Sequence, residues 1–220
     1  SIASKIAESM DARSVDVDPS YLARPDAIAS LAISYRPGEP VPHVAYLDTE
    51  HELWQKVVAH IVPLRRQRVC AEVQAMVGAF ELDFERLPQL ADISVRVEAA
   101  SGFRLEPVGG LIEPREFLES LADGVFCATQ FVRDAKVPFA APEPDVIHEL
   151  LGHAATLADP TIAELNRAFG LAAREADDAE LERIARAYWF TLEHGIVLEQ
   201  GQPKAFGAAL LSSSKELESF

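Results

Sequence analysis

Apolar residues that recur every three to four positions limit most strongly how this chain can fold. This spacing places apolar side chains on one face of an α-helix, whereas a half-buried strand would alternate apolar and polar residues. The clearest run follows Asp48, a residue able to cap a helix. Its apolar positions are Leu53, Trp54, Val57, Val58 and Ile61. Similar runs occur throughout the chain, so we predict a mainly α (α+β) fold, a helical basket with a few short strands.

Prolines and glycines divide these runs into separate elements. Helices are expected over residues 1–10, 48–62, 69–80, 90–99, 114–135, 160–173 and 178–199, with a further helix opening at Asp145. A short strand is expected over residues 103–108, and residues 206–212 fit either a strand or a helix. Five prolines between residues 19 and 42 argue against a long helix there. We therefore predict a lead-in at residues 1–40, packed on or flexible beside one domain at residues 41–220.

The amino-acid composition and net charge exclude some classes of binding partner. The 220 residues include 35 acidic and 20 basic side chains, a formal net charge of −15. Such a field repels polyanions, so we expect neither nucleic acid nor a membrane surface as partner. No apolar run approaches the roughly 20 residues that cross a bilayer, and residues 1–10 do not resemble a secretory signal. Two isolated cysteines indicate a reducing compartment, and we expect a cytoplasmic protein.

The strongest chemical signal is the pair His148 and His153, which encloses Glu149 and Gly152. In the zinc protease pattern H-E-x-x-H the histidines lie four positions apart, one turn along a helix. Here the second histidine is five positions on, about 140° further round an ideal helix. Both rings can meet one metal only if the helix loosens or ends between them, and Gly152 offers such a place.

A metal site needs a third ligand, and Glu193 is a distinctive candidate. It follows a largely apolar segment at residues 188–192, where a buried charge would be costly unless paired or ligated. Two histidines and one carboxylate form the ligand set of non-heme Fe(II) enzymes that activate oxygen. Alternatively, His148 and His153 are ordinary helix residues and Glu193 faces water. Spacing alone leaves both interpretations open.

Four segments that are well separated in the chain resemble motifs of one known family. They are Pro142–His153, Tyr188–Glu193, Ser101–Gly110 and Lys204–Ser213, which read PEPDVIHELLGH, YWFTLE, SGFRLEPVGG and KAFGAALLSS. In order and spacing they closely resemble the pterin-dependent aromatic amino acid hydroxylases. The resemblance continues in register over residues 41–218, a range that contains all four motifs.

This resemblance implies that His148, His153 and Glu193 bind Fe(II) and that tetrahydrobiopterin is the cofactor. Members of the family use dioxygen to hydroxylate the ring of phenylalanine, tyrosine or tryptophan. Trp189 stands where the tryptophan-hydroxylating animal enzymes usually have phenylalanine, which favours phenylalanine or tyrosine as substrate. We expect L-phenylalanine, converted to tyrosine or to a positional isomer such as meta-tyrosine, with hydroxylation of tyrosine or tryptophan as the alternative.

The resemblance also implies two groups of binding residues. The substrate group is Arg133, Asp145, Pro144, Trp189, His194 and Ser212. Within it, Arg133 would bind the substrate carboxylate, and Asp145 would orient that region by pairing with Arg133. The cofactor group is Gly110, Leu111, Ile112, Phe117, Glu149 and Tyr188, with the Phe117 ring stacked on the pterin.

The chain departs from the family at the substrate side. His194 replaces a common phenylalanine beside the substrate ring, and Ala140-Ala141 stand where Tyr-Thr is common. Nothing resembles the regulatory domain or tetramerisation helix of the animal enzymes, so we expect a monomer or at most a dimer. The segment Arg65–Arg68 is interpreted as a solvated helix face.

Two functions of other classes remain as alternatives. One is a zinc hydrolase that uses Glu149 as its base, although the five-residue spacing of the histidines argues against it. The other is a protein that binds a metal or an amino acid without turnover.

Overall fold

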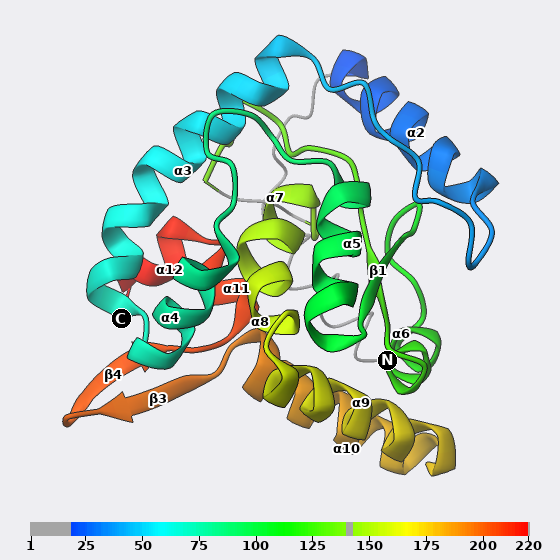
Figure 1. The fold of residues 1–220 in the computed structure, drawn as a ribbon, viewed down its shortest axis with the longest axis vertical. Helices are drawn as coiled ribbons and strands as arrows, with labels where there is room; N and C mark the ends of the chain where they lie inside the picture. Colours follow the sequence, from blue (N-terminus) through cyan, green and yellow to red (C-terminus); the bar gives the residue numbers. More distant parts are fainter. Residues whose placement is uncertain (1–18, 140–142, 220) are drawn as a thin grey trace.

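A short helical segment lies at the centre of the fold (Figure 1). It consists of α7 (Val146–His148), the π-helix η1 (Glu149–Ala154) and α8 (Ala155–Leu157). Around it pack α4 (Ala71–Phe80), α5 (Leu90–Ser101) and α11 (Ala208–Leu211). The structure, a computed structural model, describes residues 19–139 and 143–219.

The remaining helices form the outer parts of the basket (Figure 1). They are α2 (Pro19–Ser34), α3 (Asp48–Arg68), α6 (Pro114–Ala122), α9 (Pro160–Glu175), α10 (Asp178–Tyr188), η2 (Trp189–Glu193) and α12 (Ser214–Ser219). Local sequence explains where several begin: the Asp159 carboxylate accepts from the first backbone N–H groups of α9, and Asp177 forms a capping box with Glu180 on α10. The predicted mainly helical class is confirmed.

Two small sheets complete the fold. Strands β1 (Arg104–Pro107) and β2 (Val125–Ala128) are parallel, with Leu105 opposite Phe126. Strands β3 (Ile196–Glu199) and β4 (Gln202–Ala205) form an antiparallel hairpin that projects from the molecule (Figure 1).

The sequence prediction was wrong for β2 and for β3, which it placed in helices over residues 114–135 and 178–199. Gly124 has a φ of 69°, a left-handed conformation that ends the helical path before Val125. The loop residues Gln200 and Gly201 both have positive φ, which matches the twist of a two-residue hairpin. Turn geometry therefore outweighed the helical spacing in both segments.

The sequence prediction was also wrong about two prolines that were expected to interrupt helices. Pro63 was expected to end its helix, but α3 continues to Arg68, and Pro25 lies inside the 16-residue helix α2. A proline inside a helix removes one hydrogen bond, which burial of an apolar face offsets. Ile61 is fully buried on α3 and Ile28 is buried on α2. The helix predicted for residues 1–10 lies outside the described residues, and the boundary at residue 40 stays a prediction.

The apolar core extends directly to the central helical segment. Its largest fully buried side chains include Trp54 on α3, Phe103 before β1 and Phe126 on β2. The ring of Phe126 lies 4.5 Å from that of His153, centroid to centroid. His153, one of the candidate metal ligands, therefore packs directly against the apolar core.

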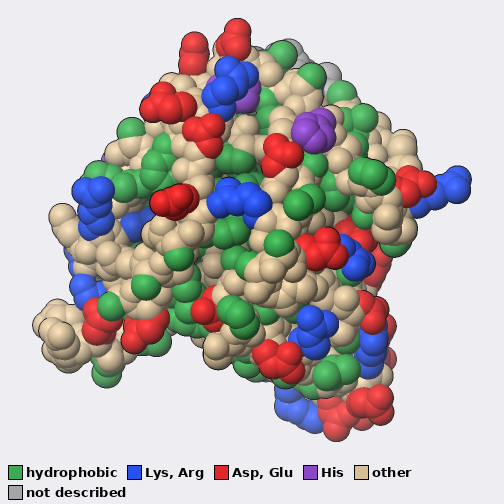
Figure 2. Space-filling model, viewed as in Figure 1, with side chains coloured by type: hydrophobic (Ala, Val, Ile, Leu, Met, Phe, Trp, Pro, Cys, Tyr) green, Lys and Arg blue, Asp and Glu red, His purple; other side chains and the backbone are tan. Residues whose placement is uncertain are grey.

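Charged side chains cover the outside of this core. Acidic and basic groups are interspersed over the face shown in Figure 2. Several form exposed ion pairs, such as Glu182 with Arg186 on α10. Among the residues that the structure describes, no helix has the length and apolar character needed to span a bilayer.

The contact between α6 and α9 requires a glycine. A Cβ atom at Gly170 would lie 2.7 Å from the backbone carbon of Leu121. Gly170→Ala is therefore expected to lower the free energy of unfolding by about 1–3 kcal/mol, measured by urea denaturation. Gly78 is the matched control, because nothing lies within 4 Å of a Cβ on that α4 residue. Gly78→Ala should raise stability by about 0.5–1 kcal/mol, and equal effects at both positions would contradict the close packing.

Candidate metal and substrate site

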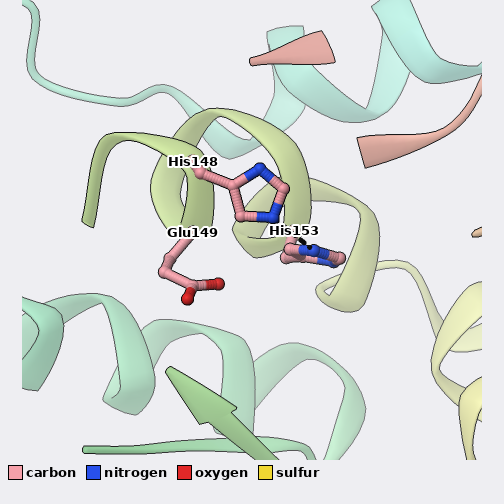
Figure 3. Close-up of side chains that lie close together, drawn as sticks. All are labelled: His148, Glu149 and His153. Carbon is pink, nitrogen blue, oxygen red and sulfur yellow. Dashed lines mark hydrogen bonds between the residues drawn. The ribbon is translucent and has the colours of Figure 1, made fainter. Parts of the chain in front are cut away.

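The two histidines meet because the helix between them is a π-helix. Residues Glu149–Ala154 form η1, in which backbone hydrogen bonds join positions five apart. Positions 148 and 153 therefore come to one side, and the Nε2 atoms of His148 and His153 lie 3.1 Å apart. Figure 3 shows the two rings turned toward one another. The helix thus loosens between the histidines, as their spacing requires.

Gly152 contributes through its missing side chain. A Cβ atom there would lie 2.7 Å from the carbonyl oxygen of Ala208 on α11. The glycine therefore lets α11 approach η1 closely, and it lies within the widened turn, where the helix was predicted to loosen.

Glu193 ends a second π-helix, η2, and faces both histidines. Its Oε1 lies 3.1 Å from Nε2 of His153, and its Oε2 lies 3.8 Å from Nε2 of His148. Two ligand atoms about 2.1 Å from a metal and at right angles to one another lie about 3.0 Å apart. The donor atoms are therefore spaced as ligands on one face of a metal would be.

A serine holds the ring of His148. The Ser212 hydroxyl lies 2.8 Å from Nδ1 of His148 and within donating distance of the carbonyls of Ala208 and Ala209, at 3.0 and 3.3 Å. When the hydroxyl donates to either carbonyl, it accepts from Nδ1. With the proton on Nδ1, the lone pair of Nε2 points toward Glu193 and His153. Such partners commonly orient histidines that bind metals.

Electrostatics also suits a cation. Burial, helped by the neighbouring His153, lowers the pKa of His148 to about 4 and keeps its imidazole neutral. Burial opposes the charge of Glu193, but the two histidines outweigh it and hold its pKa at about 2. Burial likewise opposes a charge on His153, but Glu193 outweighs it and raises that pKa, so a metal ion that binds here would displace a proton from His153. This donor set, imidazole nitrogen plus carboxylate, fits Fe(II).

Glu149 lies next to these ligands but is held differently. One of its carboxylate oxygens is within 4.8 Å of the donor atoms of both histidines, and Figure 3 shows the side chain to one side of the two rings, on the same helical segment. The Thr129 backbone N–H donates to Oε1 over 3.1 Å. Burial raises the pKa of Glu149 to about 7. Because Glu193 is in direct contact with His153 and Glu149 is held by Thr129 at the end of β2, Glu193 is the better candidate for a third ligand.

The Arg133 and Asp145 side chains form the predicted pair. The Nε and Nη2 atoms of Arg133 donate to the two carboxylate oxygens over 2.9 and 2.6 Å, and both side chains are buried. Asp145 also accepts from the backbone N–H of His148 and so caps α7. The Asp145 carboxylate therefore links the Arg133 side chain to the backbone of His148, the first histidine.

Trp189 and His194 lie on either side of Glu193 in the chain, and their rings contact each other at a tilt of 37°, with centroids 4.3 Å apart. Nδ1 of His194 is buried and has no hydrogen-bond partner among residues 19–139 and 143–219.

Pro144, a further residue of the predicted substrate group, is held by its backbone. The carbonyl of Pro144 accepts from the Thr129 hydroxyl at 2.9 Å. The Ala140-Ala141 departure lies outside the described residues.

The cofactor group falls on four elements. Phe117 on α6 meets the Tyr188 ring edge-on at 5.5 Å, and Glu149 lies on η1. The loop Gly110–Ile112 joins β1 to α6, and Leu111 within it is 68% exposed. The structure brings Phe117 and Tyr188 into contact, and the exposed loop precedes them.

Sequence reasoning missed two polar residues of the site. Thr129 contacts Glu149 and Pro144, and Asn166 accepts a hydrogen bond from the Tyr188 hydroxyl at 3.0 Å. A lone threonine or asparagine carries no spacing signal, so only the fold reveals these contacts.

Comparisons with known proteins agree with this geometry. The family model described as biopterin-dependent aromatic amino acid hydroxylase matches residues 4–220. The tyrosine 3-monooxygenase of Mus musculus is 43% identical over 208 residues, and the phenylalanine-4-hydroxylase of Homo sapiens is 39% identical over 205 residues. Each alignment covers 91% of this chain, which spans 41% and 45% of those proteins, less than half their length.

A solved structure is also similar. It is the phenylalanine hydroxylase of Chromobacterium violaceum with bound iron(III) and oxidised cofactor 7,8-dihydrobiopterin. The TM-score is 0.76 with 27% sequence identity, over 91% of this chain and 73% of that one.

Proposed function

Because this chain belongs to the family of biopterin-dependent aromatic amino acid hydroxylases, we propose that it is an iron- and tetrahydrobiopterin-dependent monooxygenase. Its substrate is an aromatic amino acid, with L-phenylalanine as the first candidate. One observation carries the proposal: His148, His153 and Glu193 converge on one point, and Ser212 orients the first of them.

In this proposal the three converging side chains hold the iron and leave part of its coordination shell free. When bound, Fe(II) and tetrahydrobiopterin supply the activation of dioxygen that ring hydroxylation needs. The protein contributes orientation: no side chain is needed as a nucleophile. Phe117, Tyr188 and Glu149, with the loop Gly110–Ile112, form the pterin side.

The substrate side is assigned to the residues linked to His148 and Glu193. Arg133, already positioned by Asp145, holds the substrate carboxylate, for which a guanidinium fork is suited. Pro144, Trp189 and His194 surround the aromatic ring, while Ser212 keeps the His148 ring in place.

Tyrosine is the second candidate substrate, and the buried Nδ1 of His194 favours it. A phenol hydroxyl would provide the hydrogen-bond partner that this nitrogen lacks within the described residues. The zinc hydrolase alternative gains no support, because the carboxylate of Glu149 is held by Thr129. A cytoplasmic location and a monomeric or dimeric state stay predictions.

A product assay tests the proposal. The protein is loaded with Fe(II), supplied with a tetrahydropterin and air, and given phenylalanine, tyrosine or tryptophan separately. Mass spectrometry and NMR then identify the product and the ring position. A hydroxylated amino acid is expected. Oxygen uptake without such a product would point to another substrate, and no uptake by protein with verified iron would contradict the proposal.

His194→Phe tests the selectivity of the site. Removing the ring nitrogens should change the ratio of tyrosine to phenylalanine turnover by about 5-fold, because one hydrogen bond contributes about 1 kcal/mol. The ratio of kcat/KM values and the product isomers measure the effect, and iron content should stay that of the unaltered protein. Unchanged ratios and isomers would show that His194 only fills space.

A further inference from the structure

Arg65 is a buried arginine in an unusual setting. Its residue is 6% exposed on α3, and none of the ion pairs found among residues 19–139 and 143–219 includes it. Burial lowers its pKa to about 10, so the guanidinium remains charged at neutral pH. The prediction of a solvated helix face at Arg65–Arg68 is therefore wrong for Arg65. Arg66 is exposed, as predicted.

The guanidinium binds two backbone carbonyls beside the metal site. Nε donates to the carbonyl of Leu211 over 2.9 Å, and Nη2 donates to the carbonyl of Leu151. Leu151 lies on η1 between His148 and His153. One side chain on α3 therefore joins the segment between both histidines to the end of α11.

The contact with Leu211 is next to the serine that orients His148. Leu211 is the last residue of α11, and the final carbonyls of a helix have no partner within it. Ser212 follows directly and holds Nδ1 of His148. A shift of Leu211 would therefore move the Ser212 hydroxyl relative to the imidazole.

Stability alone gives little reason for a charge at this position. Removing a guanidinium from water is costly, and replacing buried charges with apolar side chains of similar volume is often neutral or stabilising. A methionine would fill much of the same space. Only the planar fork of arginine, however, can donate to two carbonyls in fixed directions.

We propose that Arg65 is a positioning residue of the metal site. It holds η1 and α11 in the arrangement that lets His148, His153 and Glu193 share one metal ion. This inference rests on the proposed function, since it assumes that these three residues bind the metal.

Titration with Co²⁺ tests the inference without relying on turnover. Binding is followed by the visible absorption of the ion in the purified full chain. For Arg65→Met we expect affinity to fall about 10–100-fold, the usual effect of losing a partner that orients metal ligands. The position and intensity of the absorption bands should change as well, because the ligands are less well aligned. Arg65→Lys, which keeps the charge but lacks the fork, should give an intermediate affinity.

Arg96→Met is the matched control. Arg96 on α5 also donates to backbone carbonyls, those of Phe80 and Glu81 at the end of α4, and its guanidinium lies over the Phe80 ring. Its loss should affect stability and leave Co²⁺ affinity and spectrum unchanged. If both methionine variants weaken Co²⁺ binding equally, a general loss of structure explains the result and the inference is wrong.

Other outcomes separate the two proposals. A folded Arg65→Met that binds Co²⁺ with unchanged affinity and spectrum would overturn the role of Arg65. If Arg65→Met does not fold, Arg65→Lys decides: altered bands support the inference, and unaltered bands overturn it. If the unaltered chain does not bind Co²⁺, or if His148→Ala binds it equally well, the assignment of the metal site is wrong, whatever the role of Arg65.

Discussion

Glu193→Ala is expected to lower hydroxylation by more than about 100-fold and to leave the purified protein without bound iron. Loss of a partner that only orients a ligand already weakens metal sites 10–100-fold, and Glu193 is assigned as a ligand itself. The variant also removes the carboxylate that pairs with His153, and Glu149, the other carboxylate near the histidines, is held by Thr129. Iron content by elemental analysis and oxygen-dependent product formation measure the two effects.

Glu182→Ala on α10 is the control for this change. It removes a carboxylate that pairs with Arg186 on the exposed surface of the helix leading to Glu193. Exposed ion pairs contribute little, so iron content and activity should stay within experimental error. A Glu193→Ala protein that keeps stoichiometric iron would show that another group, such as the nearby Glu149, completes the site.

The candidate metal site could be proposed from the sequence because its residues have a local pattern and stand in motifs that resemble one family, although the spacing alone left an ordinary helix open. The five-residue spacing of His148 and His153 excluded a regular α-helix around one metal, and η1 has the widened turn that the spacing demands. Glu193 was noticeable because it follows an apolar segment. Both clues depend only on neighbours in the chain.

The missed features depend on contacts between distant segments. Asn166 reaches Tyr188 across 22 residues, and Arg65 reaches Leu211 across 146. Strand β2 was placed in a helix because its pairing with β1 and the turn at Gly124 outweigh local preference. Hydrophobic spacing predicts which face of an element is buried, but it does not show which partner satisfies a buried polar group.

Asp145→Ala is expected to lower the free energy of unfolding by about 3–5 kcal/mol. The carboxylate is fully buried and accepts from Nε and Nη2 of Arg133, so its loss leaves an unpaired buried charge. It also removes the cap on the backbone N–H of His148. For a chain of this length the midpoint of thermal unfolding should fall by roughly 6–20 °C. Urea denaturation gives the free energy, and a loss below about 1 kcal/mol would mean that Arg133 finds another partner.

A double variant separates stability from recognition. Asp145→Leu combined with Arg133→Met removes both charges, and an apolar pair of similar volume often restores the stability lost by breaking one partner. We expect the double variant to recover most of the free energy of unfolding. Its apparent KM for the amino acid should nevertheless stay at least about 10-fold raised, because the guanidinium that would bind the substrate carboxylate is gone. Recovery of both properties would show that the pair only supports the fold, and the assignment of Arg133 to the substrate site would then be wrong.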